Sequence, residues 1–551
     1  MIDLSDAKKL HNALFEAEEY RRCRQMWLRI QDKQLPFLGE LDQRDKFVKK
    51  DRGIIDMTAW RANMIFSGGM ANGSVPQTVE WFDFDVDTED QIAKEIAESR
   101  RDTVNLALNH SNFYSAVHYA YQELPFGQSP VGAFFDATMG IVFENYSVGS
   151  YAYALDQFRN VMSFAVKKKF TYRQLAQKFG LEKCPENIKT ALKDKRSTES
   201  TVNCYWLVTL NPDIKYGVFG ADGKRYLSLY WVEGEDNYIS TGGFDVMPIA
   251  IAPYCVVPNC NYGIGPGWFA DSDTAMMHAQ LRNAFGNMEL FSRPPVQAPS
   301  GVEVDYRPGM VTELNGVDMG KVESLFNIAP AFQAIFETAQ ATQDNINSAY
   351  NVNLFAMLEQ AKFDGQGRTA FELDLRHQEK MQQLSPIVTR INHEFLGRLI
   401  EVVYSYYERN NGFAPIPPEY DGMNIDVKYV SPLAQVQKMS GLQTYEYLLN
   451  GLMQLAQLKP EIAGILDAET FIREYANKTG APTKLLYDKK EYSELLQQQA
   501  QAVEEEKQMA EITTAAPAVR DYTAAVANVN EMATDGSNPA VEQLLASLQQ
   551  V

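Results

Sequence analysis

Apolar residues recur at helical spacing on both sides of a short, turn-rich segment near the middle of the chain. The first apolar stripe lies between residues 274 and 291, after Asp-Ser-Asp at 271–273, which are good helix N-cap types, and before Arg-Pro-Pro at 293–295, which ends a helix. A second stripe, from Pro330 to about Tyr350, predicts another helix, because proline suits the first helical position. Between them, alternation at Val302 and Val304 and the turn dipeptides Pro-Gly and Asn-Gly predict a small β unit. The order predicts a helical hairpin that leaves a body and returns to it.

The chain downstream of the hairpin reads as a polar loop followed by a long helix. The loop spans Glu359–Arg368, with sequence EQAKFDGQGR, and the residues TAFE that follow at 369–372 form a capping-box pattern. An apolar stripe from Leu384 to Val403 predicts the helix. Pro386 lies within it and predicts a kink near Leu384, because proline removes one helical hydrogen bond and clashes with the preceding turn.

The remaining pattern predicts further helices around a set of antiparallel strands. The stretch 130–260 is rich in aromatic and β-branched residues with glycine turns, which is typical of strands. We predict helices at 5–35, at 58–70 and from 88 to 107 or beyond, a helical insertion at 172–197, strands at 81–86 and 423–430, and helices after Ser431. From Glu491 the chain is rich in Gln, Ala and Glu, and no internal repeat is found.

Length and charge limit the classes of protein that fit. At 551 residues the chain should hold two or more domains, and 45% apolar residues suffice for burial. Lys and Arg number 51 against 71 Asp and Glu, a net charge of −20, which argues against a general nucleic-acid binder without excluding a protein along which DNA slides. The plainer interpretation of −20 is solubility.

The cysteine content and the N-terminus predict folding in a reducing cytoplasm. The five cysteines are scattered and odd in number, so they do not indicate a disulfide scaffold. The N-terminal segment is polar and amphipathic without an apolar signal core, and no stretch reaches 18 uncharged apolar residues.

Three short motifs admit a ligand-binding interpretation, and each has a simpler one. SGGMANG at 67–73 lacks the Lys and Ser/Thr spacing of a P-loop, so close packing or a turn is favoured over phosphate binding. YGIGPG at 262–267 does not follow a clear strand into a dinucleotide-binding unit. Asp-Ser-Asp at 271–273 could bind a cation, but its place before a helix favours capping.

Titratable side chains show no catalytic or metal-binding pattern. No pair of the six histidines has i, i+4 spacing with a third ligand, so we expect no zinc site and no cofactor. Cys255 and Cys260 read as packed cysteines. Acid–base chemistry needs a carboxylate pair over one substrate bond, and a solvated or intersubunit helix face is the simpler interpretation of the acidic residues on the long helix. These are Glu372, Asp374, Glu379 and Glu394.

Several segments, in this order along the chain, resemble the head-to-tail connector, or portal, proteins of short-tailed (podovirus-type) bacteriophages. Weaker similarity extends upstream to residues 56–86 and downstream to 481–492, so that most of 50–495 is covered, while the last 50 or so residues resemble nothing that we can place. The matching segments are YGIGPG (262–267), LRNAFGNMELFSRPPVQAP (281–299), NLFAML (353–358), GRTAFELDLRHQEKMQQLSPIVTRINHEFL (367–396) and VKYVSPLAQVQK (427–438).

The resemblance implies an α+β portal fold with a helical stem, a small β-containing clip, a mixed α/β wing and a helical C-terminal crown. The implied parts are an N-terminal wing (1–266), stem helix 1 (267–292), clip (293–326), stem helix 2 (327–352), tunnel loop (353–368), wing kinked helix and strand (369–433), and crown with helical tail (434–551). It also implies a non-enzymatic ring of twelve subunits at one capsid vertex, formally −240 in charge, with double-stranded DNA passing through its channel during packaging and ejection.

The implied partners are the major capsid protein, the terminase that acts as packaging ATPase, and tail adaptor or tail proteins, in the virion and, during assembly, in the host cytoplasm. In the tunnel loop we expect Lys362 and Arg368, with Gly365 and Gly367, to approach DNA phosphates; solvated loop charge is the simpler interpretation. KVESLF (321–326) and four charged residues of the clip are candidates for adaptor docking. The four are Arg293, Asp305, Arg307 and Glu313.

Two rival functions stay open at this point. An internal virion or scaffolding protein would have helices but form no closed ring, and a carboxylate-pair hydrolase would be active without assembly. Neither rival requires the order of helix, β unit, helix, loop and kinked helix found here.

Overall fold

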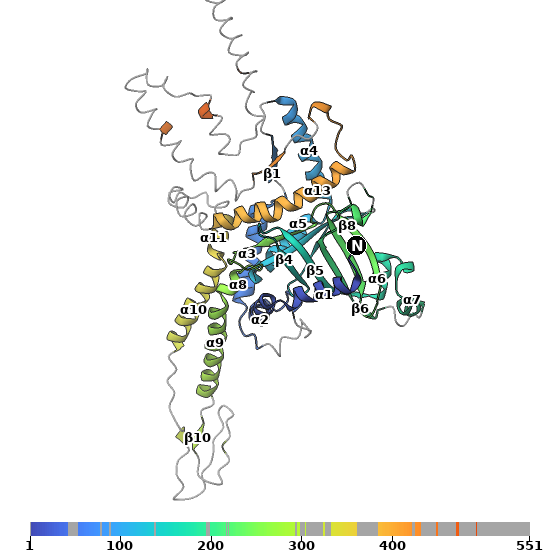
Figure 1. The fold of residues 1–551 in the computed structure, drawn as a ribbon. Coiled ribbons are helices and arrows are strands. Elements are labelled where there is room, and N and C mark those ends of the chain that lie inside the picture. Colours follow the sequence, from blue (N-terminus) through green and yellow to red (C-terminus); the bar gives the residue numbers. More distant parts are fainter. Residues whose placement is uncertain are drawn as a thin grey trace, which may run out of the picture. The chain divides into compact units, whose positions relative to one another are not determined.

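The computed structural model divides the chain into two units, Met1–Gly441 and Leu442–Val551 (Figure 1). Only a few residues of the second unit are described, so the account below concerns the first. The described residues are 2–41, 53–77, 80–86, 90–136, 139–193, 199–215, 218, 220–292, 295–297, 304, 323–324, 332–360, 384–420, 425–430, 448–449, 470–472 and 492.

The N-terminus forms two helices where the sequence pattern predicted one. α1 (Leu4–Glu16) and α2 (Glu18–Lys33) are separated at Ala17, whose ψ of 136° is not helical. Apolar residues keep their helical spacing on both sides of Ala17, because both helices bury apolar side chains against the rest of the first unit. Trp27 of α2 is fully buried and donates from Nε1 to the Phe126 carbonyl oxygen at 2.8 Å.

A helical layer follows, close to its predicted positions. Asp90 caps α4 by accepting from the Ile92 amide. The helices are α3 (Thr58–Ser74), α4 (Gln91–His110) and α5 (Phe113–Glu123), with a short 3-10 turn η1 (Leu124–Phe126) after α5.

The predicted strands of 130–260 form two antiparallel sheets. One sheet has the order β3-β2-β9 and the other β4-β5-β6-β7-β8. A short 3-10 turn, η3 (Ala221–Gly223), precedes β7. The strands are β2 (Gln128–Asp136), β3 (Gly140–Asn145), β4 (Tyr151–Leu155), β5 (Val161–Thr171), β6 (Thr201–Leu210), β7 (Tyr226–Val232), β8 (Tyr238–Phe244) and β9 (Ile249–Pro253).

The predicted helical insertion lies between β5 and β6. It contains α6 (Tyr172–Phe179), the 3-10 turn η2 (Leu181–Lys183) and α7 (Glu186–Lys193). Thr171 and Gln174 form a capping box that starts α6.

Two predicted strands far apart in the chain pair with each other. β1 (Phe82–Asp85) and β12 (Asp426–Tyr429) form an antiparallel two-stranded sheet, with Phe82 opposite Tyr429. The Val430 amide adds a bond of 2.9 Å to the Trp81 carbonyl oxygen. This sheet joins the segment before α4 to the segment after the long helix.

The long helix departs from regular α geometry after Pro386, in a stretch that begins at Ile391. Residues 384–390 are helical, Ile391–Leu396 form a π-helical stretch (η4), and α13 (Gly397–Arg409) continues, with a 3-10 turn η5 (Pro418–Tyr420) beyond. Residues 361–383 are outside the described residues, so the predicted kink near Leu384 stays a prediction. Ile391, Phe395 and Leu396 are fully buried, so the widened turn lies in the core.

The core contains a buried carboxyl group beneath the start of β2. Glu123 accepts from the Tyr119 hydroxyl at 3.1 Å and the Val148 amide at 3.0 Å. Burial raises the pKa of Glu123 from 4.5 to about 7, against the opposing effect of these donors. Between those two values the folded protein binds more protons than the unfolded chain, so stability falls as pH rises from 4.5 to 7 and the loss is complete above 7.

Replacing Glu123 by glutamine is expected to remove this pH dependence. From pH 5.5 to pH 8 the wild type should lose about 2 kcal/mol of unfolding free energy through the deprotonation of Glu123. The variant lacks this proton equilibrium, so it should not show this loss. Thermal unfolding of both proteins at the two pH values measures the difference, in which all other titrating groups cancel. Parallel pH profiles for the two proteins would contradict the expectation.

Candidate functional site

The two predicted hairpin helices are present and pack side by side. α9 (Asp271–Ser292) follows a short helix, α8 (Pro266–Phe269), and lies along α10 (Phe332–Ala349), which leads into α11 (Val352–Gln360) (Figure 1). The Thr342 hydroxyl donates to Gln280 Oε1 at 3.3 Å, linking the helices. Both helix predictions are confirmed, α9 beginning at Asp271, so the three predicted cap residues form its first turn.

The far end of the hairpin carries one antiparallel pair of short strands in the region of the predicted β unit. β10 (Val296–Gln297) and β11 (Glu323–Ser324) are antiparallel, with Val296 opposite Ser324. Most of the segment between them, including Val302, is outside the described residues.

α2 fixes the base of the hairpin through α9. Arg29 forms an ion pair with Asp271, whose side chain is only 4% exposed. His278 Nε2 donates to the Lys33 carbonyl oxygen at 3.1 Å, which leaves Nδ1 to accept from the Ile55 amide at 3.4 Å. These contacts assign Asp271 to anchoring α9. Because α9 already begins at Asp271, the capping role predicted for the Asp-Ser-Asp motif is wrong.

A further clamp comes from the end of α10. The fully buried Tyr350 donates from its hydroxyl to Gln34 Oε1 at 2.9 Å, and Gln34 Nε2 donates to the Gly267 carbonyl oxygen at 2.8 Å. One residue after α2 thus holds both the return helix and the segment that starts the hairpin.

The glycines of YGIGPG allow close contact between two stretches of backbone. A Cβ on Gly265 would lie 2.1 Å from the Leu124 carbonyl oxygen, and one on Gly267 would lie 2.8 Å from that of Pro125. Gly127, with a φ of +120°, faces Gly263 in the same way. These close approaches are between backbone atoms, so the motif seats α8 against η1.

SGGMANG is helical, since it forms the last two turns of α3, and the prediction of a turn there is wrong. A Cβ on Gly69 would lie 2.2 Å from the ring of Phe355 in α11. The alternative of close packing is confirmed: the missing side chain makes room for Phe355, which is buried.

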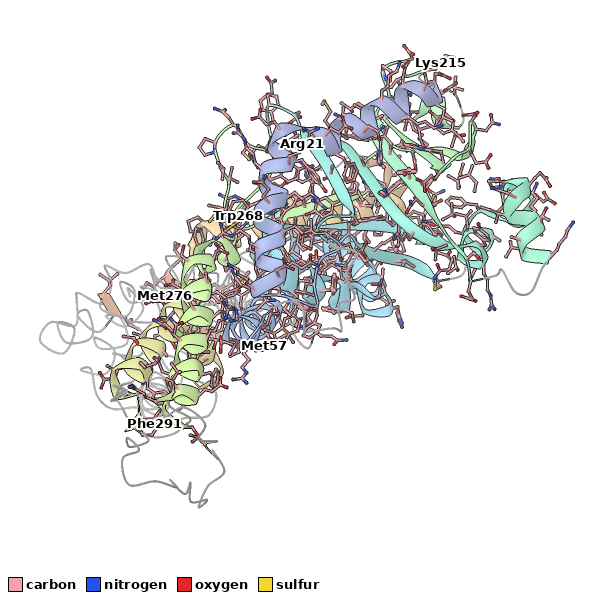
Figure 2. The ribbon with its side chains drawn as sticks, turned by 90° about the horizontal axis from the view of Figure 1, so that it is seen from below. Arg21, Met57, Lys215, Trp268, Met276 and Phe291 are labelled. Carbon is pink, nitrogen blue, oxygen red and sulfur yellow. The ribbon has the colours of Figure 1, made fainter. Side chains whose placement is uncertain are left out.

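Large apolar side chains remain exposed along the hairpin. On α9, Phe285 and Phe291 are 57% and 58% exposed, and on α10 Phe336 is 59% exposed. Figure 2 shows Met276 and Phe291 along α9, with Trp268 near its start. Exposed apolar side chains of this size are candidates for contact with another molecule. We call it the hairpin patch, and its members are Met276, Phe285, Met288, Leu290, Phe291 and Phe336.

The hairpin helices carry more acidic than basic side chains. α9 has Asp271, Asp273 and Glu289 against Arg282, and α10 has Glu337 and Asp344 without a basic residue. Each helix therefore has a formal charge of −2, and a phosphate-rich polymer would find little attraction along them.

Neither a metal nor an acid–base site emerges among the described residues. No group of three or more His, Cys, Asp or Glu side chains there could hold a metal ion. Glu394 lies on the π-helical stretch, where burial raises its pKa, and its ion-pair partner is Arg390 at 3.8 Å. Glu372, Asp374 and Glu379 are outside the described residues, so a carboxylate pair cannot be built from them.

The residues predicted to approach DNA or to dock an adaptor are outside the described residues. This applies to Lys362, Gly365, Gly367 and Arg368 of the tunnel loop and to Arg293, Asp305, Arg307 and Glu313 of the clip. Pro386 is described and lies exposed on its helix. The part 353–368, which the resemblance implies as tunnel loop, begins as helix, and α11 covers the first two residues of the predicted loop 359–368. Along the helices that are described, none is long and apolar enough to cross a membrane.

The role of α2 as the anchor of the hairpin was not predicted from the sequence. Its only signal was the run of charged and amide residues around an apolar stripe, which does not reveal a partner 242 positions away.

The chain is similar to proteins that connect phage heads and tails. The sequence model of the family described as bacteriophage head to tail connecting protein matches residues 6–486. The portal protein of Salmonella phage epsilon15 is 28% identical over 479 residues, which cover 83% of each chain. A probable portal protein of Bordetella phage BPP-1 is 25% identical over 475 residues, covering 84% of this chain and 85% of that protein.

Two solved structures show a distant likeness. The neck of an empty gene transfer agent (GTA) particle, computed with C6 symmetry, and the virion of the native particle give TM-scores of 0.36 and 0.35. Both are 10% identical to this chain and cover 71% of it, and 86% and 85% of their own chains. Superpositions at this level add nothing to the family match.

Proposed function

The chain belongs to the family of bacteriophage head-to-tail connecting proteins, and from this premise we propose that twelve copies close into a ring around a channel for double-stranded DNA. Its function is that of a portal at the capsid vertex, where head and tail join. The fold is of the α+β class expected from the sequence.

The hairpin patch carries the proposal of a ring. A cyclic assembly joins one surface of each subunit to a different surface of the next, and closure leaves no copy with an uncovered patch. Phe285, Phe291 and Phe336 are each more than half exposed on a hairpin that α2 and Gln34 hold rigidly, so the patch is presented in a fixed position. Burying side chains of this size contributes about 1.5–3 kcal/mol each.

The charge of the hairpin supports a channel through which DNA moves. With α9 and α10 each at a formal −2, the helices would repel rather than hold a duplex that carries roughly one negative charge per 1.7 Å. DNA that is not held can be driven in during packaging and released during ejection. The tunnel loop, with Lys362 and Arg368, would supply the few attractive contacts.

The proposed partners are the major capsid protein, a terminase and tail adaptor proteins, which meet the ring first in the host cytoplasm and then in the virion. The clip is the proposed docking site for adaptors. We assign no chemical reaction to this chain: the sequence lacks P-loop spacing, and a separate ATPase would supply the packaging energy.

Negative-stain electron microscopy of the purified protein, with mass photometry alongside, tests the ring. Closed rings of about twelve subunits with a central hole are expected. A homogeneous monomer that never closes, with or without capsid protein, would overturn the proposal and favour an internal virion protein.

Deleting residues 361–368 is expected to spare the ring and lower DNA retention. The deletion leaves α11 intact and removes Lys362 and Arg368, so most heads should package DNA but lose it before tails attach. The measurement is the fraction of DNA-filled particles in complemented infections. A matched variant that keeps the loop length but carries Lys362→Gln and Arg368→Gln separates the role of charge from that of length; wild-type retention in both would refute a role of the loop.

A further inference from the structure

The helical insertion concentrates positive charge in a chain that is otherwise strongly acidic. Residues 167–196 contain ten Lys and Arg against three Asp and Glu, a net charge of +7, so the other 521 residues sum to −27. We call residues 167–196 the basic lobe; residues 167–193 of it are described. A chance distribution of charge in a protein at −20 would leave such a segment near neutral or acidic.

The basic lobe is a folded body with a small core of its own. Leu175 of α6 and Ile188 of α7 are buried together with Cys184, against Cys204 and Val232 of the five-stranded sheet. The capping box at Thr171 fixes the start of α6 where β5 ends. Figure 1 shows α6 and α7 together beside the sheet. The cations are therefore held on a firm support rather than on a loose tail.

Most of these cations lack a carboxylate partner. Lys168 is paired with Glu144 at 2.5 Å and Lys189 with Glu186 at 2.8 Å, which shows that acids within reach are used. The other described cations of α6, η2, α7 and the end of β5 are exposed and form no ion pair with any described residue. They are Lys167, Lys169, Arg173, Lys178, Lys183 and Lys193.

Lys178 is held at a defined place by aromatic rings. Its Nζ lies 5.2 Å from the ring centroid of Tyr230, 5.4 Å from Phe170 and 5.8 Å from Phe179. Cation–π contacts hold the ammonium group in place without pairing it with a carboxylate, so it remains available to an outside anion.

We propose that the basic lobe binds the phosphate backbone of duplex DNA without regard to sequence, at a site separate from the channel. The proposal rests on the proposed function, because it takes DNA as the polymer that this protein meets. Five of the six unpaired cations are lysines, whose ammonium groups are compact point charges, and both Lys and Arg neutralise phosphates without reading the base sequence. The lobe thus offers the ring a place to hold DNA that its acidic hairpin does not.

A protein partner fits the lobe less well. Protein–protein interfaces have an apolar centre inside a polar rim. Leu181, at 52% exposed, is the one large apolar side chain with high exposure among the described residues of the lobe. The exposed surface therefore consists mainly of charge, as is typical of a contact with a polyanion.

Binding of the full-length protein to a fluorescein-labelled double-stranded DNA fragment, followed by anisotropy at increasing salt, tests this inference. The lobe variant carries Lys169→Glu, Arg173→Glu, Lys183→Glu and Lys193→Glu. A control variant with the same change in net charge carries reversals at exposed sites elsewhere, two of them labelled in Figure 2. These control sites are Arg21, Arg22, Lys94 and Lys215.

The wild type and the control should bind fragments of unrelated sequence equally, with log affinity falling linearly against log salt. The lobe variant should lose at least tenfold in affinity, and its salt slope should be shallower by about one for each phosphate contact removed. A second variant with glutamine at the four lobe positions should lose less, because it removes charge without adding repulsion. Unchanged melting temperatures of the variants show that they are folded.

Equal affinity of the lobe variant and the control would overturn the proposal. So would stronger competition by a poly-glutamate chain than by unlabelled DNA of equal charge, which would indicate an acidic protein partner instead. Electron microscopy of the same samples distinguishes the two proposals. If the lobe variant forms rings but has lost DNA binding, the proposal that the basic lobe binds DNA is supported. If the wild type forms no rings, only the proposal that this protein is a ring-forming portal is contradicted.

Discussion

Replacing Phe285 and Phe291 together by glutamate is expected to leave a folded monomer that does not close into rings. The two side chains are 57% and 58% exposed, so the isolated chain tolerates the change. In a ring each would be buried against a neighbour, and the variant would lose about 1.5–3 kcal/mol of apolar burial per side chain and bury a charge as well. Because the loss recurs at every interface, mass photometry should show monomers where the wild type gives rings.

A matched substitution elsewhere shows whether the hairpin patch is special. Phe158, on the turn between β4 and β5, is 76% exposed, more than either hairpin phenylalanine. Phe158→Glu should keep the ring, since it replaces one exposed phenylalanine by glutamate at a site outside the patch; the single variant Phe291→Glu is its exact counterpart within the patch. Wild-type ring abundance for the double hairpin variant would mean that the patch lies outside the subunit interface.

Gly265→Ala is expected to destabilise the fold severely, by about 3 kcal/mol or more. The new Cβ would lie 2.1 Å from the Leu124 carbonyl oxygen and 2.8 Å from that of Pro125. Its φ of −128° suits alanine, so the cost is steric overlap with backbone rather than strain in the residue itself. Relief requires moving η1, whose Phe126 carbonyl accepts from both Trp27 and Trp268.

Gly286→Ala is the control for this prediction. Gly286 lies within α9 and a Cβ there meets nothing within 4 Å, so alanine should stabilise the helix by about 0.5–1 kcal/mol. Thermal unfolding of the two variants should therefore shift in opposite directions. A Gly265→Ala protein that melts with the wild type would show that η1 and α8 can separate at little cost.

Local signals predicted the helices of the hairpin, and tertiary contacts decided what those signals could not. Proline stops and cap residues mark α9 and α10, so their bounds followed within a few residues. For SGGMANG the turn alternative was wrong, because Gly69 makes room for Phe355, some 290 positions later, and does not mark a local turn. The break at Ala17 has no marker either, since alanine favours helix.

The apolar stripe of α9 shows what a sequence pattern cannot predict. Met277, Leu281 and Phe285 belong to one stripe by spacing, yet Met277 is buried, Leu281 half-buried and Phe285 exposed. Periodicity reveals that a helix face is apolar, but not whether it packs on its own chain or on another molecule. The candidate interface therefore becomes visible only in the structure, which distinguishes the buried residues of the stripe from the exposed ones. By contrast, the charge of the basic lobe was present in the sequence and was masked by the net value of −20.

The pairing of β1 with β12 has a consequence for the order of events on the ribosome. Asp85 and Asp426 are paired, so the strand made first waits for some 340 residues to be synthesised before its partner exists. At about 5–20 residues per second that interval lasts roughly 20–70 s. During it the edge of β1 is open, and Trp81 and Phe82, which are buried in the finished protein, have no β12 to cover them. The fold of the first unit therefore cannot be completed until α9, α10 and the segment between them have been synthesised. As a result, an incomplete chain does not present the folded surface through which subunits would assemble.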